Sequence, residues 1–219
     1  MKFLKDIINM KLYLSSYKLG NEIEKLTKMI KGNKRIAVIS NSLDCYSDLE
    51  RRKQGDLKEI KQLEEHGIKP EVLDLRDYFG KKEKLELILK TFNGLWVRGG
   101  NTFVLRIAMK KSGLDEILQK GELGTDFVYA GYSAGCCVLA PSIKGFENVD
   151  DPKQTENAYP NEKLIWEGLG LIDFVFVPHY KSDHPESAYI DEVIEYLEKN
   201  NISYEPFSDG EVYINETKD

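Results

Sequence analysis

The feature that most constrains the fold is the alternation of short apolar runs with longer segments of helical periodicity. Apolar runs predict strands at residues 11–15, 35–40, 71–75, 94–97, 127–130, 171–177, 202–207 and, in a hairpin-like arrangement, 211–215. Helical periodicity predicts helices at residues 21–31, 47–65, 82–90, 102–111, 114–120 and 184–199, and another that begins at residue 133. Strands that alternate with helices favour a mostly parallel sheet with helices on both faces.

Chain length and loop distribution predict one α/β domain over residues 1–219. Residues 1–9 precede the first predicted core strand and are interpreted as an N-terminal extension. The polar stretch at residues 144–162 is a candidate lid. Cys45, Cys136 and Cys137 are odd in number and include an adjacent pair, which gives neither a disulfide framework nor a metal-binding spacing.

Composition narrows the classes of protein that fit this pattern. Hydrophobic residues make up 41% and charged residues 31% of the chain, as in ordinary globular proteins. The net charge is −6, and no long basic run suggests a nucleic-acid partner. No segment approaches the roughly 18–20 apolar residues that span a bilayer, and the N-terminus lacks a secretory signal pattern. We therefore predict a cytoplasmic protein without a nucleic-acid or membrane partner.

Polar clusters follow five of the predicted strands. Ligands of parallel sheets bind outside the carboxyl ends of the strands, so these clusters are expected to share one edge. They are Asn41-Ser42-Leu43-Asp44, Arg98-Gly99-Gly100-Asn101, Tyr132-Ser133-Ala134-Gly135, Pro178-His179-Tyr180 and Ser208-Asp209-Gly210.

The segment Gly131-Tyr132-Ser133-Ala134-Gly135 has the G-x-S-x-G pattern of a nucleophile elbow between a strand and a helix. Such a turn holds the serine in a strained conformation, and the following helix directs N–H groups toward a developing oxyanion. A tight structural turn that needs small residues is the competing interpretation. The sequence context favours Ser133 as a nucleophile.

A serine nucleophile needs a base, and the chain has three histidines. His66 precedes a glycine at the end of a helix and is interpreted as a C-cap residue. His179 follows a predicted strand on the edge of Ser133 and is the better base. His184 stands at a helix entry, with substrate contact as the alternative.

Asp209 is the expected orienting acid because it follows the next strand on the same edge, although a turn aspartate before glycine is an equal alternative. Asp173 begins the strand of His179 and is placed about 20 Å away, at the opposite end. Glu186, Asp150 and Asp151 are the alternative candidates for the orienting acid.

The Gly99-Gly100 turn is predicted to bring a backbone N–H close to a substrate carbonyl, because no Cβ intervenes. Its spacing is not that of a dinucleotide-binding motif. Cys136 and Cys137 are interpreted as small core residues, with Cys136 as a less favoured thiol nucleophile.

Three segments in this order, GGNTF at 99–103, AGYSAGCCVLAPSI at 130–143 and VPHY at 177–180, resemble the peptidase E family, S51, with its aspartyl dipeptidases and cyanophycinases. The resemblance implies a flavodoxin-like α/β fold related to class I glutamine amidotransferases, and peptide cleavage without a metal or other cofactor. It implies Ser133 as nucleophile and His179 as base, with oxyanion N–H groups from Gly100 and Ala134. Asp209 falls where aspartyl dipeptidases have a glutamate.

Two positions depart from the family pattern. Asn148 stands where the family suggests an acid, which favours Asp209 as the third member. Ala188 stands where aspartyl dipeptidases have an arginine, so an aspartyl preference is doubtful; Arg98 or His184 could substitute. With Gly99 and Asn101, these two complete the predicted substrate-binding set.

The sequence therefore predicts a serine-type peptidase that hydrolyses short peptides through a Ser-His-acid triad and an acyl-enzyme. The alternative is a non-catalytic domain of the same fold that binds a small ligand or regulates a partner. The expected partner is a short peptide substrate, with a homodimer left open.

Overall fold

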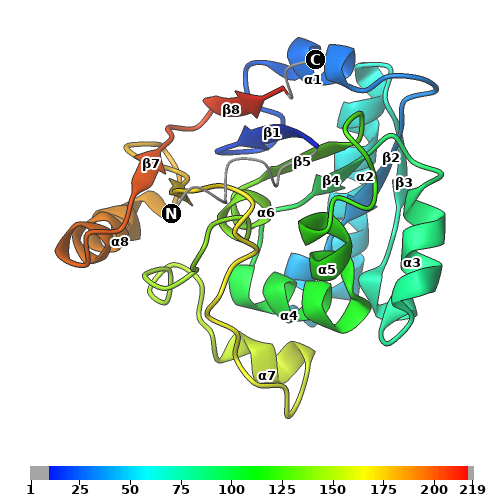
Figure 1. The fold of residues 1–219 in the computed structure, drawn as a ribbon. Helices are drawn as coiled ribbons and strands as arrows, with labels where there is room; N and C mark the ends of the chain where they lie inside the picture. The colour runs from blue at the N-terminus through cyan, green and yellow to red at the C-terminus, as the bar shows by residue number, and fades with distance from the viewer. Residues whose placement is uncertain (1–9, 217–219) are drawn as a thin grey trace.

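The central sheet has six strands in the order β3-β2-β4-β5-β1-β8 in the computed structural model, which describes residues 10–216 (Figure 1). The strands are β1 (Lys11–Ser15), β2 (Arg35–Ile39), β3 (Lys69–Val72), β4 (Gly94–Val97), β5 (Val128–Tyr132) and β8 (Val212–Asn215). The first five run parallel, and β8 pairs antiparallel with β1. The mostly parallel α/β sheet predicted from the sequence is confirmed.

Helices cover both faces of this sheet. The helices of the described residues are α1 (Ile23–Met29), α2 (Leu49–Glu65), α3 (Lys82–Leu89), α4 (Thr102–Ser112), α5 (Leu114–Gln119), α6 (Ala134–Cys137), α7 (Gln154–Ala158) and α8 (Ser187–Lys199), with 3-10 turns η1 (Asn41–Leu43) and η2 (Leu75–Tyr78). Of these, α7 packs on α4 and α8 packs on β6. No helix within residues 10–216 combines the length and apolarity needed to cross a membrane.

Strand alternation explains the two layers. Ile36 and Val38 of β2 pack with residues of α1 and α2, whereas Ala37 and Ile39 of the same strand pack with α3, α4 and α5. Successive side chains of a strand point to opposite faces, so one buried strand serves two cores.

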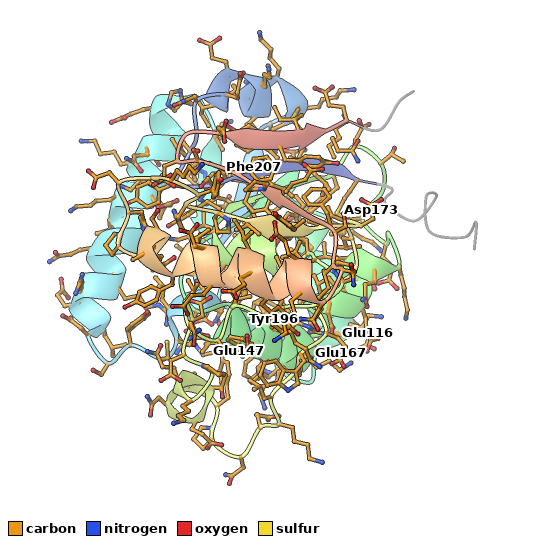
Figure 2. All side chains as sticks on the ribbon, turned by 90° about the vertical axis from the view of Figure 1, so that its left-hand side faces the viewer. Glu116, Glu147, Glu167, Asp173, Tyr196 and Phe207 are labelled. Carbon is orange, nitrogen blue, oxygen red and sulfur yellow. The ribbon has the colours of Figure 1, made fainter. Side chains whose placement is uncertain are left out.

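A separate two-stranded parallel sheet contains β6 (Val175–Val177) and β7 (Tyr204–Pro206). The expectation that residues 171–177 and 202–207 extend the central sheet is therefore wrong. A third apolar cluster joins Ile190 and Val193 of α8 to β6, to Cys137 of α6 and to Ile143 in the segment after α6. Figure 2 shows α8 beside the two-stranded sheet of β6 and β7, with Tyr196 near the loop that contains Glu147.

Several predicted boundaries also differ. The strand expected at 71–75 is β3, which ends at Val72 because Leu75 turns into the buried side of η2. The strand expected at 171–177 begins only at Val175, and α8 begins at Ser187, after His184. The expected hairpin at 211–215 is instead β8 against β1, and the polar stretch 144–162 contains α7. The predicted extension at residues 1–9 lies outside the described residues.

Candidate active site

The nucleophile elbow joins β5 to α6. Ser133 has φ 47° and ψ −116°, a left-handed conformation that costs free energy for a residue with a Cβ. A Cβ on Gly131 would come within 2.7 Å of the Val97 carbonyl of β4, and one on Gly135 would meet the same oxygen. The two glycines of the G-x-S-x-G pattern are therefore required by close packing of the turn on β4.

The Gly99-Gly100 turn lies against this elbow. A Cβ on Gly99 would be 3.1 Å from the Ser133 Cβ. Gly100 has φ 141°, and a Cβ there would come within 2.7 to 2.9 Å of Leu43 and Ser42. Within residues 10–216, neither the Gly100 N–H nor the Ala134 N–H donates a hydrogen bond. Both predicted oxyanion donors are thus unused.

His179 follows β6 and is held by two other segments. Its side chain is 1% exposed and its Nδ1 lies 2.7 Å from Oδ1 of Asp209. The carboxylate accepts the Nδ1 proton, which leaves Nε2 of the neutral ring with a free lone pair. Burial lowers the pKa of His179, and the hydrogen bond to Asp209 opposes this effect. The structure thus brings the predicted base and acid together.

Ser16, directly after β1, was missed by the sequence reasoning. Its buried hydroxyl accepts the His179 N–H at 2.8 Å and lies 3.0 Å from Oδ1 of Asp209 and 3.1 Å from the Phe207 carbonyl. His179 has φ 61°, so this bond helps to hold a strained backbone. The rule that polar residues after strands form the site, applied to β1, could have identified Ser16.

The Nε2 atom of His179 faces Glu186 in this structure. It lies 3.4 Å from Oε2 of Glu186, and no hydrogen bond joins His179 to the Ser133 hydroxyl among the described residues. The His184 ring stacks on His179 with centroids 3.8 Å apart and planes 7° apart. The Tyr17 ring makes T-shaped contacts with both imidazole rings.

Two further carboxyl groups near this edge have raised pKa values. Burial raises the pKa of Glu186 to about 7, and the charges of Asp150 and Asp209 add to the effect. Burial raises the pKa of Asp150 to about 6, although it accepts the Thr102 N–H of α4 at 2.9 Å. Asp150 therefore caps α4 instead of contacting His179.

Two predicted substrate-binding residues have other partners. Arg98 is 8% exposed, and its guanidinium pairs with Asp56 and lies 3.5 Å from Glu59, both on α2. Asn101 caps α4 by accepting the Val104 N–H at 3.0 Å, and its Nδ2 donates to the Asp151 carbonyl at 2.9 Å. Neither side chain is free for a substrate in this structure.

Cys136, Asn148 and His66 have surroundings that fit a structural role. Cys136 is fully buried, its Sγ lies 3.3 Å from the Gly131 carbonyl, and burial raises its pKa well above the ordinary value. A thiolate is therefore disfavoured there. Asn148 donates to Oε2 of Glu192 at 2.6 Å on the exposed side of α8, and His66 is the exposed C-cap of α2.

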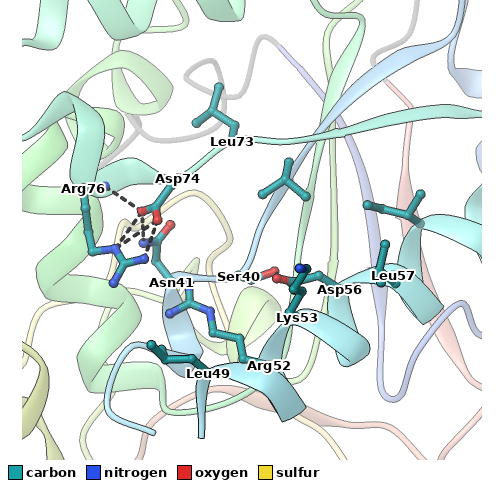
Figure 3. Close-up of a pocket in the computed structure, with 12 residues that line it drawn as sticks. Ser40, Asn41, Leu49, Arg52, Lys53, Asp56, Leu57, Leu73, Asp74 and Arg76 are labelled. Carbon is teal, nitrogen blue, oxygen red and sulfur yellow. Dashed lines mark hydrogen bonds and ion pairs between the residues drawn. The ribbon is translucent and has the colours of Figure 1, made fainter. Parts of the chain in front are cut away.

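A cavity of about 310 Å³ opens at the ends of β2 and β3 (Figure 3). None of Ser133, His179 and Asp209 lines it. Within the lining, Asp74 accepts hydrogen bonds from Arg76 and Asn41, as the dashed lines of Figure 3 mark. Arg52 pairs with Asp44 and Asp56 pairs with Arg98, two partners that do not line the cavity. The cavity is separate from the elbow.

Residues 22–211 match the family model of peptidase family S51. The chain belongs to this family. Relatives include an uncharacterised peptidase of Listeria monocytogenes serovar 1/2a, 29% identical over 143 residues that cover 65% of each chain. Another is peptidase E of Streptomyces coelicolor, 34% identical over 116 residues, which cover 50% of this chain and 43% of the relative. An uncharacterised peptidase of Listeria innocua is 33% identical over 88 residues, 40% of this chain and 39% of the relative.

In each of these alignments the chain spans less than two thirds of the curated relative. Among solved structures, a protein described as a peptidase E of Listeria monocytogenes EGD-e has a TM-score of 0.71 at 23% identity, covering 95% of this chain and 99% of the other. A peptidase from an acI-B1 Actinobacterium has a TM-score of 0.59 at 17% identity, covering 84% and 75%. The predicted family and its amidotransferase-like α/β fold are confirmed.

Proposed function

We propose that the chain is a serine peptidase that hydrolyses short peptides through an acyl-enzyme. Membership of family S51 supports a peptidase. The observation that carries the triad is the 2.7 Å contact between Nδ1 of His179 and Asp209. It lies at the end of β1, where the Ser15 carbonyl accepts the Ser133 N–H at 3.3 Å and the Ser16 hydroxyl accepts the His179 N–H at 2.8 Å.

In this proposal, Ser133 Oγ attacks the peptide carbonyl while His179 Nε2 takes its proton. The imidazolium then protonates the leaving amine, and water hydrolyses the ester by the same route. Asp209 holds the tautomer that keeps Nε2 unprotonated. The unused N–H groups of Gly100 and Ala134 receive the tetrahedral oxyanion, at about 3 to 4 kcal/mol per donor in comparable sites.

Nε2 has to leave Glu186 and face Ser133 for this reaction. Catalytic hydrogen bonds are often long or absent before substrate binds, and tighten in the complex. We infer that the bound peptide separates Glu186 from His179 and brings the serine and the imidazole together.

We infer a preference for short peptides because residues 150 and 151, which belong to the candidate lid at residues 144–162, are anchored beside the Gly99-Gly100 turn. Asp150 accepts from Thr102, and the Asp151 carbonyl accepts from Asn101. We assign no aspartyl preference, because Ala188 has no charge and Arg98 is already paired.

Fluorophosphonate labelling with mass-spectrometric site mapping tests the nucleophile directly. We expect a single adduct on Ser133, loss of labelling and of dipeptide hydrolysis in Ser133→Ala, and retention of both in Ser112→Ala. Ser112 is a matched control because it is a buried serine at the end of α4. Full peptidase activity in Ser133→Ala would refute the mechanism.

The non-catalytic alternative draws on one observation, the absence of a hydrogen bond between Ser133 and His179 in the described residues. It predicts no labelling at Ser133 together with tight retention of a small ligand. A dipeptide library with varied first residues separates the two functions, because only the peptidase releases free amino acids.

A further inference from the structure

We propose that His179, His184 and Glu186 form a binding site for a zinc-class divalent cation, and that the bound ion blocks the peptidase. Binding of the ion stands on geometry alone. Its inhibitory effect rests on the function proposed above.

The spacing of the donor atoms supports the site. Each of the three residues offers one ligand atom, and these atoms lie within 4.8 Å of one another. His179 Nε2 and Glu186 Oε2 are 3.4 Å apart. Two ligands at about 2.0–2.1 Å from a tetrahedral zinc ion are separated by about 3.3–3.4 Å, so this pair already has the required spacing.

A second observation concerns the other side of the His179 ring. Histidines that bind zinc almost always donate their second ring N–H to a carboxylate or carbonyl, which orients the ring and raises its basicity. Nδ1 of His179 has this arrangement, with Oδ1 of Asp209 at 2.7 Å. The backbone N–H of His179 is fixed by Ser16 at 2.8 Å. The metal-facing Nε2 is thus held in place in advance.

His184 supplies the third ligand after a rotation of its ring. The rings of His179 and His184 are stacked with planes 7° apart. A nitrogen lone pair lies in the ring plane, so one ion cannot meet both lone pairs of a parallel stack. His184 is only half-buried, and its Nδ1 accepts one bond of 3.3 Å from the Glu186 N–H. Rotation of this side chain exchanges that bond and the ring contacts with His179 and Tyr17 for a bond to the ion.

The donor set determines which ions bind. Two imidazoles and one carboxylate suit zinc and its neighbours among the transition metals, whereas magnesium and calcium prefer oxygen ligands. The fourth position of a tetrahedral ion is left to water. Because the ion takes the Nε2 lone pair of His179, that nitrogen can no longer accept the proton of Ser133.

Metal binding is tested first without an activity assay, by competition of the untagged protein with a chromophoric chelator for zinc. We expect one zinc ion per chain, no competition by magnesium, and affinity at least about tenfold weaker in Glu186→Gln and in His184→Ala. His66→Ala and Glu192→Gln, an exposed histidine and an exposed glutamate outside the cluster, should bind zinc like the wild type. The proposed site would be overturned if the wild type did not bind zinc stoichiometrically, or if both Glu186→Gln and His184→Ala bound zinc as tightly as the wild type.

Dipeptide hydrolysis then tests the effect of the ion. We expect zinc to inhibit the wild type reversibly, with recovery on addition of a chelator. When the inhibition of each protein is measured against its own metal-free rate, the zinc concentration for half inhibition should be about tenfold or more higher in Glu186→Gln than in the wild type. Zinc binding without any peptidase activity in the metal-free protein would support the metal site and reject the proposed function. Peptidase activity that saturating zinc leaves unchanged would reject inhibition through His179.

Discussion

Replacement of Ser16 by alanine tests whether the hydroxyl after β1 holds the base and the acid together. In the wild type, this group accepts the buried His179 N–H at 2.8 Å and lies 3.0 Å from the Asp209 carboxylate. Ser16→Ala leaves the His179 N–H without a partner, and the Asp209 carboxylate loses one donor.

The magnitude follows from these contacts. A buried N–H without an acceptor costs about 1–3 kcal/mol, and a hydrogen bond to a charged group contributes about 1.5–3 kcal/mol. We expect the free energy of unfolding to fall by about 2–3 kcal/mol. Since the strained His179 backbone loses its anchor, we expect kcat/KM for a dipeptide to fall by about 10–100-fold.

The assay combines urea unfolding with steady-state hydrolysis. Ser112→Ala is the matched control, because the Ser112 hydroxyl also accepts a backbone N–H, from Leu114 at 3.4 Å, and donates to a carbonyl, of Met109 at 3.1 Å. It should lose stability without a comparable loss of kcat/KM. Equal activity in the two folded variants would show that Ser16 acts only on stability.

Three other predictions concern the same edge. Asp209→Asn should lower kcat about 10³–10⁴-fold in dipeptide hydrolysis, by analogy with triads that lose the required tautomer; a loss below tenfold would reject Asp209 as the orienting acid. Gly100→Ala should lower the free energy of unfolding in urea by more than 1 kcal/mol, since its φ is 141° and the added Cβ would meet Ser42 and Leu43; unchanged stability would contradict this. Since burial lowers the pKa of His179, and activity needs the neutral ring, the acid limb of the kcat/KM profile should lie below pH 6.5; a limb above pH 6.5 would contradict the proton balance.

Much of the fold follows from local patterns in the chain. The bounds predicted for the strands at 11–15 and 94–97 are those of β1 and β4, because each is a short apolar run between polar turns. Sheet membership was harder to predict. The mostly apolar stretch at 171–174 fits a strand pattern, yet its backbone is irregular, with Leu171 and Phe174 buried in the main core. A run of apolar residues reports burial, and the partner strand is decided by packing between distant segments.

The candidate site shows the same division. The elbow, His179 and Asp209 could be predicted because each follows a strand, and the structure brings His179 to Asp209. Arg98 also follows a strand, but the acidic residues that pair with it stand on α2, about forty positions earlier in the sequence. The contact between Glu186 and His179 depends on where α8 begins, which is at Ser187, three residues after the start of the helix predicted at 184–199.

The pairing of β8 with β1 has a consequence for biosynthesis. Ser16 is among the first residues that the ribosome makes in the described chain, and its partner Asp209 follows 193 positions later. Strands β1 to β5 can assemble on a nascent chain while His179 still lacks its acid. Under the proposed mechanism, hydrolytic competence arises only when the turn that carries Asp209 docks beside β1, so a polypeptide that ends before this turn has the elbow without its orienting acid.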